Sequence, residues 1–221
     1  MPEILLILGT DLAGKDYVAN ILADTARETG KMVERKRGWF SARPDSTRTS
    51  EDKGLVKLGM EWLFLVTLPV HYRLLPALVT LLIRFDLLRF RRPATDLLVV
   101  VSHTALRLLA LSLGYQGKEV AAIRMAPWVE RTLQAIVPAT GAKVVVLDIE
   151  HSIRAERIAR RNQSGTLDVF DRYMGRDPER SERIEQILVW LATTYLQAHR
   201  VENNNCGKAE LLARIAAINA R

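Results

Sequence analysis

The chain has 221 residues, 48% of them hydrophobic, and a formal net charge of +7 at pH 7. This length and apolar fraction are typical of one soluble globular domain with a sizeable core. The single cysteine, Cys206, excludes an internal disulfide, and the N-terminal residues show no charged-then-apolar leader with a cleavage site. We therefore expect a cytoplasmic protein.

The positive charge suits anionic ligands of several kinds, namely nucleotides, phosphorylated metabolites, nucleic acid or an acidic membrane face. Arginines gather near positions 35–37, 89–92 and 154–161, but the few aromatic residues are not interleaved with them. A stacking platform for bases is therefore not supported, and we expect no nucleic-acid partner.

The first predicted elements are a buried strand and a helix joined by a glycine-rich loop. Residues 3–24 read EILLILGTDLAGKDYVANILAD, in which the apolar run Ile4–Leu8 stops at Gly9 and helical spacing begins after Lys15. A short apolar run is typical of a strand buried on both faces of a parallel sheet. A loop of Gly9, four residues, Gly14 and Lys15 presents backbone N–H groups at a helix N-terminus, where phosphate binds. The loop predicts nucleoside triphosphate binding, and the alternative is an ordinary strand-to-helix turn with a solvated lysine.

Asp16 departs from the usual form of this loop. Ser or Thr normally follows the lysine and places a hydroxyl on Mg²⁺, whereas this chain has a carboxylate there. A carboxylate is also a hard oxygen ligand, so we expect Asp16 to hold the metal directly or through water. A loop that ends Gly-Lys-Asp resembles those of some small-molecule kinases, such as phosphomevalonate kinases and phage deoxynucleotide kinases.

The rest of the chain alternates predicted strands and helices. A polar loop at 38–54 is expected on the substrate side, and a second loop at 162–171 is expected to close over the site. Alternating strands and helices imply a parallel sheet with helices on both faces and ligands outside the carboxyl ends of the strands. We predict further strands within 31–38, 95–103, 142–150 and 199–205, and helices at 105–113, 152–161 and 208–218.

The segment 55–92 is more apolar than a nucleotide pocket requires. A membrane span needs about 20 apolar residues in succession, and two prolines, a histidine and an arginine between positions 69 and 76 divide the segment into shorter runs. Three interpretations stay open: buried core helices, the surface of a homodimer, or a patch for a lipid-like substrate or membrane surface. Arg73 is expected to point into a pocket, because a charge in an apolar helix needs a partner.

The order of these parts resembles the nucleoside monophosphate kinase branch of the P-loop proteins, most closely the thymidylate kinase-like family. GTDLAGKD (9–16) is similar to the family's Gly-x-Asp-x-x-Gly-Lys loop, and SARPDST (41–47) to the loop that touches the acceptor. VVVLDIEHSIRAERIARR (144–161) is similar to the strand and helix that lead into the lid, and VENNNCGKAELLARI (201–215) to the last strand, the adenine-side loop and the last helix. The resemblance implies a three-layer α/β P-loop NTPase fold over residues 1–221, with a lid at 154–172.

The motifs and the resemblance together imply ATP and Mg²⁺ as cofactors, and they assign roles to individual residues. The family's Asp-Arg pair after its third strand is replaced here by Ser102 and His103, and Arg107 is expected to supply the missing cation. We assign catalytic roles to Lys15, Asp11, Arg157 and Arg161; ATP binding to Gly9, Thr10, Asp11, Leu12, Ala13, Gly14, Lys15, Asp16, Arg160 and Asn203; acceptor binding to Arg43, Arg73, His103 and Arg107; and metal binding to Asp16.

An arginine-rich lid suits phosphoryl transfer, because that reaction depends on alignment and on fixed positive charge around the moving group. The alternative is a solvated basic helix face paired with Glu150 and Glu156. His103 likewise is either a donor to phosphate or a structural histidine.

The leading prediction is a phosphotransferase that moves the γ-phosphoryl of ATP to a small acceptor, with a nucleoside monophosphate as the acceptor that the resemblance suggests. The alternatives are a catalytically degenerate nucleotide-binding switch or partner-binding subunit, a kinase for a lipid-like or sugar acceptor, and a peripheral membrane protein that uses residues 62–92.

Overall fold

The computed structural model describes residues 3–9, 13–41, 67–68, 70–93, 97–102, 104–166 and 169–219, and the statements below concern these residues. The predicted site residues Thr10, Asp11, Leu12, Arg43 and His103 lie outside the described residues.

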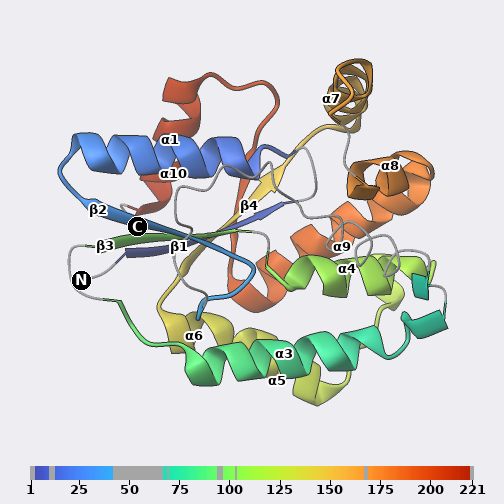
Figure 1. Ribbon diagram of the computed structural model, residues 1–221. Helices are drawn as coiled ribbons and strands as arrows, with labels where there is room; N and C mark the ends of the chain where they lie inside the picture. The colour runs from blue at the N-terminus through green and yellow to red at the C-terminus, as the bar shows by residue number, and fades with distance from the viewer. Residues whose placement is uncertain are drawn as a thin grey trace.

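A parallel sheet forms the centre of the molecule (Figure 1). Its described strands lie in the order β2-β3-β1-β4-β5, and their bounds agree with the predicted strands. In register, Leu6 of β1 is opposite Val101 of β3 and Val144 of β4, so the first strand is central and its carboxyl end opens between two neighbours. The strands are β1 (Glu3–Gly9), β2 (Met32–Arg37), β3 (Leu97–Ser102), β4 (Lys143–Asp148) and β5 (His199–Glu202).

Side chains of β1 alternate between the two faces of the sheet, and each face has its own apolar core. Leu5 and Ile7 pack with the buried residues of α1 (Lys15–Glu28) and α10 (Lys208–Asn219). Leu6 and its alternating neighbours pack on the opposite face, which is covered by α4 (Leu106–Tyr115) and α9 (Pro178–Leu196). The three-layer α/β fold with helices on both faces is therefore confirmed.

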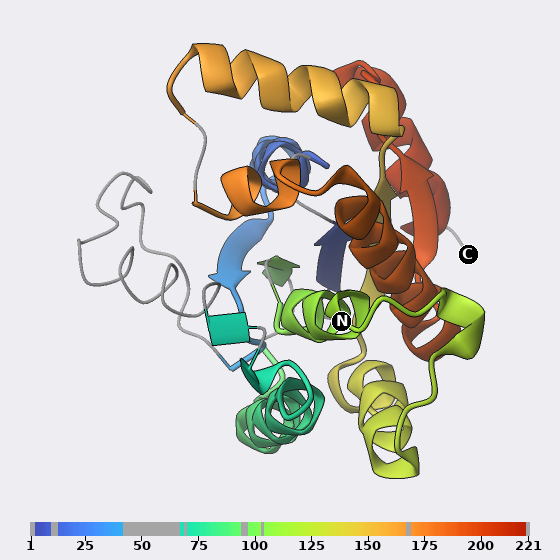
Figure 2. The ribbon, with the colours of Figure 1, turned by 90° about the vertical axis from the view of Figure 1, so that its right-hand side faces the viewer.

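Smaller helices surround these layers. They are α5 (Pro127–Gln134), α6 (Ile136–Thr140) and the 3₁₀ turn η1 (Val120–Ala122). Two more, α7 (His151–Gln163) and α8 (Val169–Gly175), lie beside the end of α1 that follows the glycine-rich loop, with α7 above α8 in Figure 2. The predicted loop at 162–171 is wrong in part, because α7 continues to Gln163 and α8 begins at Val169.

Helix α9 is the long element that the sequence analysis did not predict. Its start carries three ordinary helix signals: Asp177 at the N-cap, Pro178 at the first helical position and Glu179 in the first turn. The Asp177 side chain accepts a hydrogen bond from the Arg180 N–H at 3.0 Å. Since α9 packs against α4 and β4, this helix builds much of the core beneath the sheet.

The apolar segment forms α3 (Leu75–Arg89) at the bottom of the molecule (Figure 1). Its inner face is buried through Leu75, Val79 and Ile83, so the core interpretation is confirmed for this face. The outer face is exposed, and the homodimer and membrane-surface interpretations stay predictions for it. Within the described ranges, no helix combines the length and the apolar character needed to cross a membrane. The exposed apolar residues here are Val70, Leu74, Leu78, Leu81, Leu82, Phe85 and Leu88.

Candidate nucleotide-binding site

The glycine-rich loop leads from the carboxyl end of β1 directly into α1. Gly14 is the N-cap of α1 and has a left-handed conformation with φ +85°, which favours glycine. Its carbonyl oxygen accepts a hydrogen bond from the Val18 N–H at 2.9 Å, so the helix is regular from its first turn. The N-cap position has no side-chain capping bond among the described residues, and the first-turn N–H groups suit an anion.

Lys15 is the first residue of α1 and only 5% exposed. A buried lysine is rare in proteins unless an anionic or polar partner accompanies it. Its position at the positive end of a 14-residue helix adds a second source of positive potential. The loop therefore concentrates positive charge where a phosphate chain would lie.

Asn203, directly after β5, contacts the end of the glycine-rich loop. Its side chain is buried, and Nδ2 donates to the carbonyl oxygen of Ala13 at 2.8 Å. Its backbone N–H donates to the carbonyl oxygen of Asp148 at 2.8 Å. ATP binding by Asn203 stays a prediction, while its described contacts give it a positioning role beneath the loop.

Arg157 is the arginine of α7 that lies beside the loop. Its Nη2 donates to the Asn203 carbonyl oxygen at 3.0 Å and to Asn205 Oδ1 at 3.1 Å. Burial lowers the pKa of Arg157 below its ordinary value, the charges of Arg160 and Arg161 lower it further, and Glu156 opposes the shift. This guanidinium is therefore partly buried and lies next to the candidate phosphate site.

Arg160 and Arg161 lie elsewhere on α7. Arg160 Nη2 donates to Glu156 Oε1 at 2.6 Å, and both side chains are largely exposed. The interpretation as a solvated basic face fits this pair, but it does not fit Arg157. Arg161 is exposed in the last turn of α7. ATP binding by Arg160 and catalysis by Arg161 stay predictions.

Asp16 lies beside two guanidinium groups. Its Oδ1 lies 3.5 Å from Arg35 Nη2 and 3.8 Å from Arg37 Nη2, and both arginines come from β2. Among the described residues, no group of three carboxylate, histidine or cysteine side chains lies together as metal ligands would. Metal binding by Asp16 stays a prediction. Arg35 and Arg37 are site residues that the sequence analysis did not assign.

An aromatic and cationic cluster lies at the ends of α3, α4 and α9. The ring centroids of Tyr72 and Tyr115 lie 5.2 Å apart in a tilted arrangement, and the Arg180 guanidinium lies 5.6 Å from the Tyr115 ring centroid and 4.8 Å from that of Tyr173. The Tyr173 hydroxyl is buried with no hydrogen-bond partner in the described part of the chain. Burial raises the pKa of Tyr173, and the charge of Arg180 opposes that shift. The sequence analysis missed this cluster because its members come from four separate segments.

Arg73 joins this cluster from an exposed turn before α3. Its Nε donates to the Tyr72 hydroxyl oxygen at 3.0 Å, and its guanidinium lies 5.7 Å from the Tyr72 ring centroid. The argument that Arg73 is a charge inside an apolar helix is wrong, because the residue is exposed and lies in a turn. Acceptor binding by Arg73 and by Arg107, which is half-buried in the first turn of α4, stays a prediction.

A central parallel sheet between helical layers, with a glycine-rich loop and a buried lysine between β1 and α1, defines a three-layer α/β fold of the P-loop NTPase type. The sequence matches no protein-family profile and no curated protein.

Among solved structures, the chain is similar to thymidylate kinase from Candida albicans, with 10% identity, a TM-score of 0.53 and coverage of 98% of this chain and 90% of that one. It is also similar to thymidylate kinase from Ehrlichia chaffeensis, with 11% identity, a TM-score of 0.46 and coverage of 99% and 98%. The YorR protein from Bacillus subtilis, solved in complex with phosphorylated GDP, shares 13% identity with a TM-score of 0.45 and coverage of 98% and 95%. The likeness to the Candida enzyme confirms the predicted thymidylate kinase-like fold.

Proposed function

We propose that the protein binds ATP at the glycine-rich loop and transfers its γ-phosphoryl group to a small acceptor. The observation that carries this proposal is the buried Lys15 at the uncapped N-terminus of α1, at the carboxyl end of the central strand. In a parallel α/β sheet this edge is where ligands bind. A loop of N–H donors and a lysine supply what a triphosphate needs, namely donors for its oxygens and compensation for its charge.

In the proposed mechanism the chain contributes positioning and fixed charge. Loop amides and Lys15 hold the donor phosphates. Arg157 on α7 is close enough to the loop to stabilise the negative charge on the phosphoryl group during its transfer. Arg161 is proposed to join it when α7 and α8 approach the loop. Mg²⁺, where it accompanies the nucleotide, would neutralise phosphate charge, and the phosphates themselves would be its main ligands.

The acceptor is proposed to bind beside the tyrosine and arginine cluster. The tilted rings of Tyr72 and Tyr115 offer apolar surface, and Arg73 and Arg180 offer guanidinium groups beside them. A planar base with an attached phosphate matches this combination, which supports a nucleoside monophosphate as acceptor. A sugar phosphate matches only the charged part, and a prenyl phosphate has no planar ring to lie against the tyrosines.

The test is a comparison of initial rates with ATP and a panel of nucleoside monophosphates, sugars and prenyl phosphates. We expect turnover with at least one nucleoside monophosphate and its loss in Lys15→Ala. Turnover confined to sugars or prenyl phosphates would contradict the nucleoside monophosphate as acceptor but would still show a phosphotransferase. No turnover with any acceptor would contradict phosphoryl transfer itself.

The pairing of Asp16 with Arg35 and Arg37 favours a second candidate function, a nucleotide-binding protein without transfer chemistry. In this case the Asp16 carboxylate would pair with the arginines of β2 and would not bind a metal. The second candidate predicts that wild-type protein binds a nonhydrolysable ATP analogue, that Lys15→Ala does not, and that no member of the acceptor panel is phosphorylated.

A further inference from the structure

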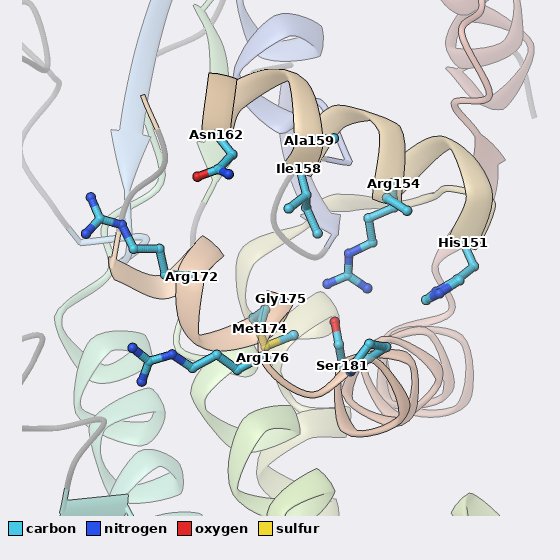
Figure 3. A pocket seen from close by; sticks show the side chains of 12 residues that line it. His151, Arg154, Ile158, Ala159, Asn162, Arg172, Met174, Gly175, Arg176 and Ser181 are labelled. Carbon is cyan, nitrogen blue, oxygen red and sulfur yellow. The ribbon is translucent and has the colours of Figure 1, made fainter. Parts of the chain in front are cut away.

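A pocket of about 450 Å³ lies between α7 and the corner where α8 meets α9 (Figure 3). Ile158 of α7 and Met174 of α8 give it an apolar lining, and Pro178 of α9 also lines it. None of the described residues of the glycine-rich loop lines it. The pocket is therefore a separate place from the candidate nucleotide site.

Arg154 extends from α7 into this pocket (Figure 3). It is 2% exposed, and its Nη1 donates to Glu185 Oε2 of α9 at 2.7 Å. Its Nε and Nη2 are also buried, and neither has a hydrogen-bond partner among the described residues. Buried donors on a charged group are costly to leave unpaired, so this pair of N–H groups indicates a missing acceptor.

The two unpaired nitrogens lie on one edge of the guanidinium group. A guanidinium is planar, and the Nε–H bond and one Nη2–H bond lie in that plane and point in nearly the same direction from one edge of it. Two oxygens of a carboxylate or a phosphate match this edge as a bidentate acceptor. The hydrogen bond from Arg154 Nη1 to Glu185 fixes the orientation of the guanidinium, and with it that of the Nε and Nη2 edge.

The surroundings of Arg154 favour an anion that carries an apolar body. Arg172 and Arg176 stand at one side of the pocket, and no acidic residue is among the described residues that line it. Ile158 and Met174 offer apolar surface on the two opposing walls. A free inorganic ion would use the charge but leave this surface uncovered.

We propose that this pocket binds a small organic anion, with its carboxylate or phosphate group on the Nε and Nη2 edge of Arg154 and its apolar part against Ile158 and Met174. The site goes beyond the proposed phosphotransfer reaction and does not depend on it. Benzoate and phenyl phosphate share the apolar ring and differ in the anionic group, so together they show which oxyanion the pocket prefers.

The test is isothermal titration of the full chain with benzoate, phenyl phosphate and inorganic phosphate. We expect one ring-bearing anion to bind at least about tenfold more tightly than inorganic phosphate, because only it covers the apolar walls. Arg154→Lys keeps a cation beside Glu185 but removes the two-donor edge, so affinity should fall about tenfold or more. Ala155→Trp fills the pocket while leaving Arg154 in place, and it should abolish binding even if the first variant proves unstable.

Two controls separate this site from others. Arg27→Met removes an exposed arginine on α1 that pairs with Asp24, and it should leave anion binding unchanged. Lys15→Ala disables the candidate nucleotide site and should also leave binding in the pocket unchanged. Failure of both ring-bearing anions to bind wild type at millimolar concentration would overturn the proposal. So would binding that Lys15→Ala removes and that Arg154→Lys and Ala155→Trp retain.

Discussion

Asn203 Nδ2 donates a hydrogen bond to the carbonyl oxygen of Ala13 at 2.8 Å, although the two residues are 190 positions apart in the chain. Because the Asn203 backbone also donates to Asp148, one buried residue ties the end of β4 to the loop before α1. This buried amide fixes the carbonyl group of Ala13, the residue directly before the N-cap Gly14. The start of α1 therefore depends on a contact from the far end of the chain.

Asn203→Ala should loosen this loop. The substitution leaves the Ala13 carbonyl buried without its donor, so we expect a loss of about 1–3 kcal/mol in the free energy of unfolding. We also expect ATP-analogue affinity to weaken about tenfold, because a looser loop must be ordered on binding. Urea unfolding and isothermal titration measure the two effects. The control is Asn204→Ala, whose side chain donates to Glu150 at the surface; equal effects of the two variants would contradict this account.

Gly14→Ala should cost more than its backbone conformation alone predicts. A Cβ at Gly14 would lie 2.5 Å from Asn203 Nδ2, in addition to the strain of φ +85°. Gly30→Ala is a matched control, because Gly30 has φ +76° and nothing within 4 Å of the added Cβ. We expect about 1–2 kcal/mol of destabilisation for the control and a larger loss for Gly14→Ala. Equal losses in thermal or urea unfolding would show that Asn203 moves aside freely.

Asp16→Asn distinguishes an ion-pair role from a metal role. Replacement of the carboxylate removes the anionic partner of Arg35 and Arg37 and takes a negative charge away from the phosphates. We expect the ATP analogue to bind a few-fold more tightly without Mg²⁺, and the effect of added Mg²⁺ to remain. Loss of the Mg²⁺ effect in this variant would instead support the metal role that the sequence predicts.

Tyr195 predicts an alkaline loss of stability. Burial, together with its hydrogen bond to Glu130 Oε1 at 3.1 Å, raises the pKa of Tyr195 to about 12. The unfolded chain has the ordinary tyrosine pKa of about 10, so it releases the proton first as pH rises. This contribution to stability is complete below pH of about 10 and is lost as pH rises toward about 12. Urea unfolding at several pH values should show a shallower alkaline decline in Tyr195→Phe than in wild type, and identical declines would contradict the assignment.

Much of the fold could be predicted because its central strands carry strong local signals. The run Ile4–Leu8 and the β-branched run at 144–146 are apolar on both faces, which only a covered parallel sheet accommodates. Helix α9 was missed although Asp177 and Pro178 mark its start. Its first turns contain mostly charged residues, so apolar residues do not recur there at helical spacing.

The site was less predictable, because its geometry depends on contacts between distant segments. The loop and its lysine follow from a local motif, and the role of Arg157 was implied by the resemblance, but the pairing of Asp16 with β2 depends on tertiary packing. Arg154 had a weak signal in the sequence, since it lies four residues before Ile158 and so shares the face of α7 that packs inward. Its partner Glu185 lies 31 residues away, in the helix that was missed.

The central claim is that the loop between β1 and α1 binds ATP through Lys15. Isothermal titration with a nonhydrolysable ATP analogue, with and without Mg²⁺, tests it in wild type, Lys15→Ala and the exposed-lysine control Lys118→Ala. The account predicts micromolar binding in wild type and the control, and a loss of at least about 100-fold in Lys15→Ala. Absence of binding in wild type, or equal binding in all three proteins, would contradict it.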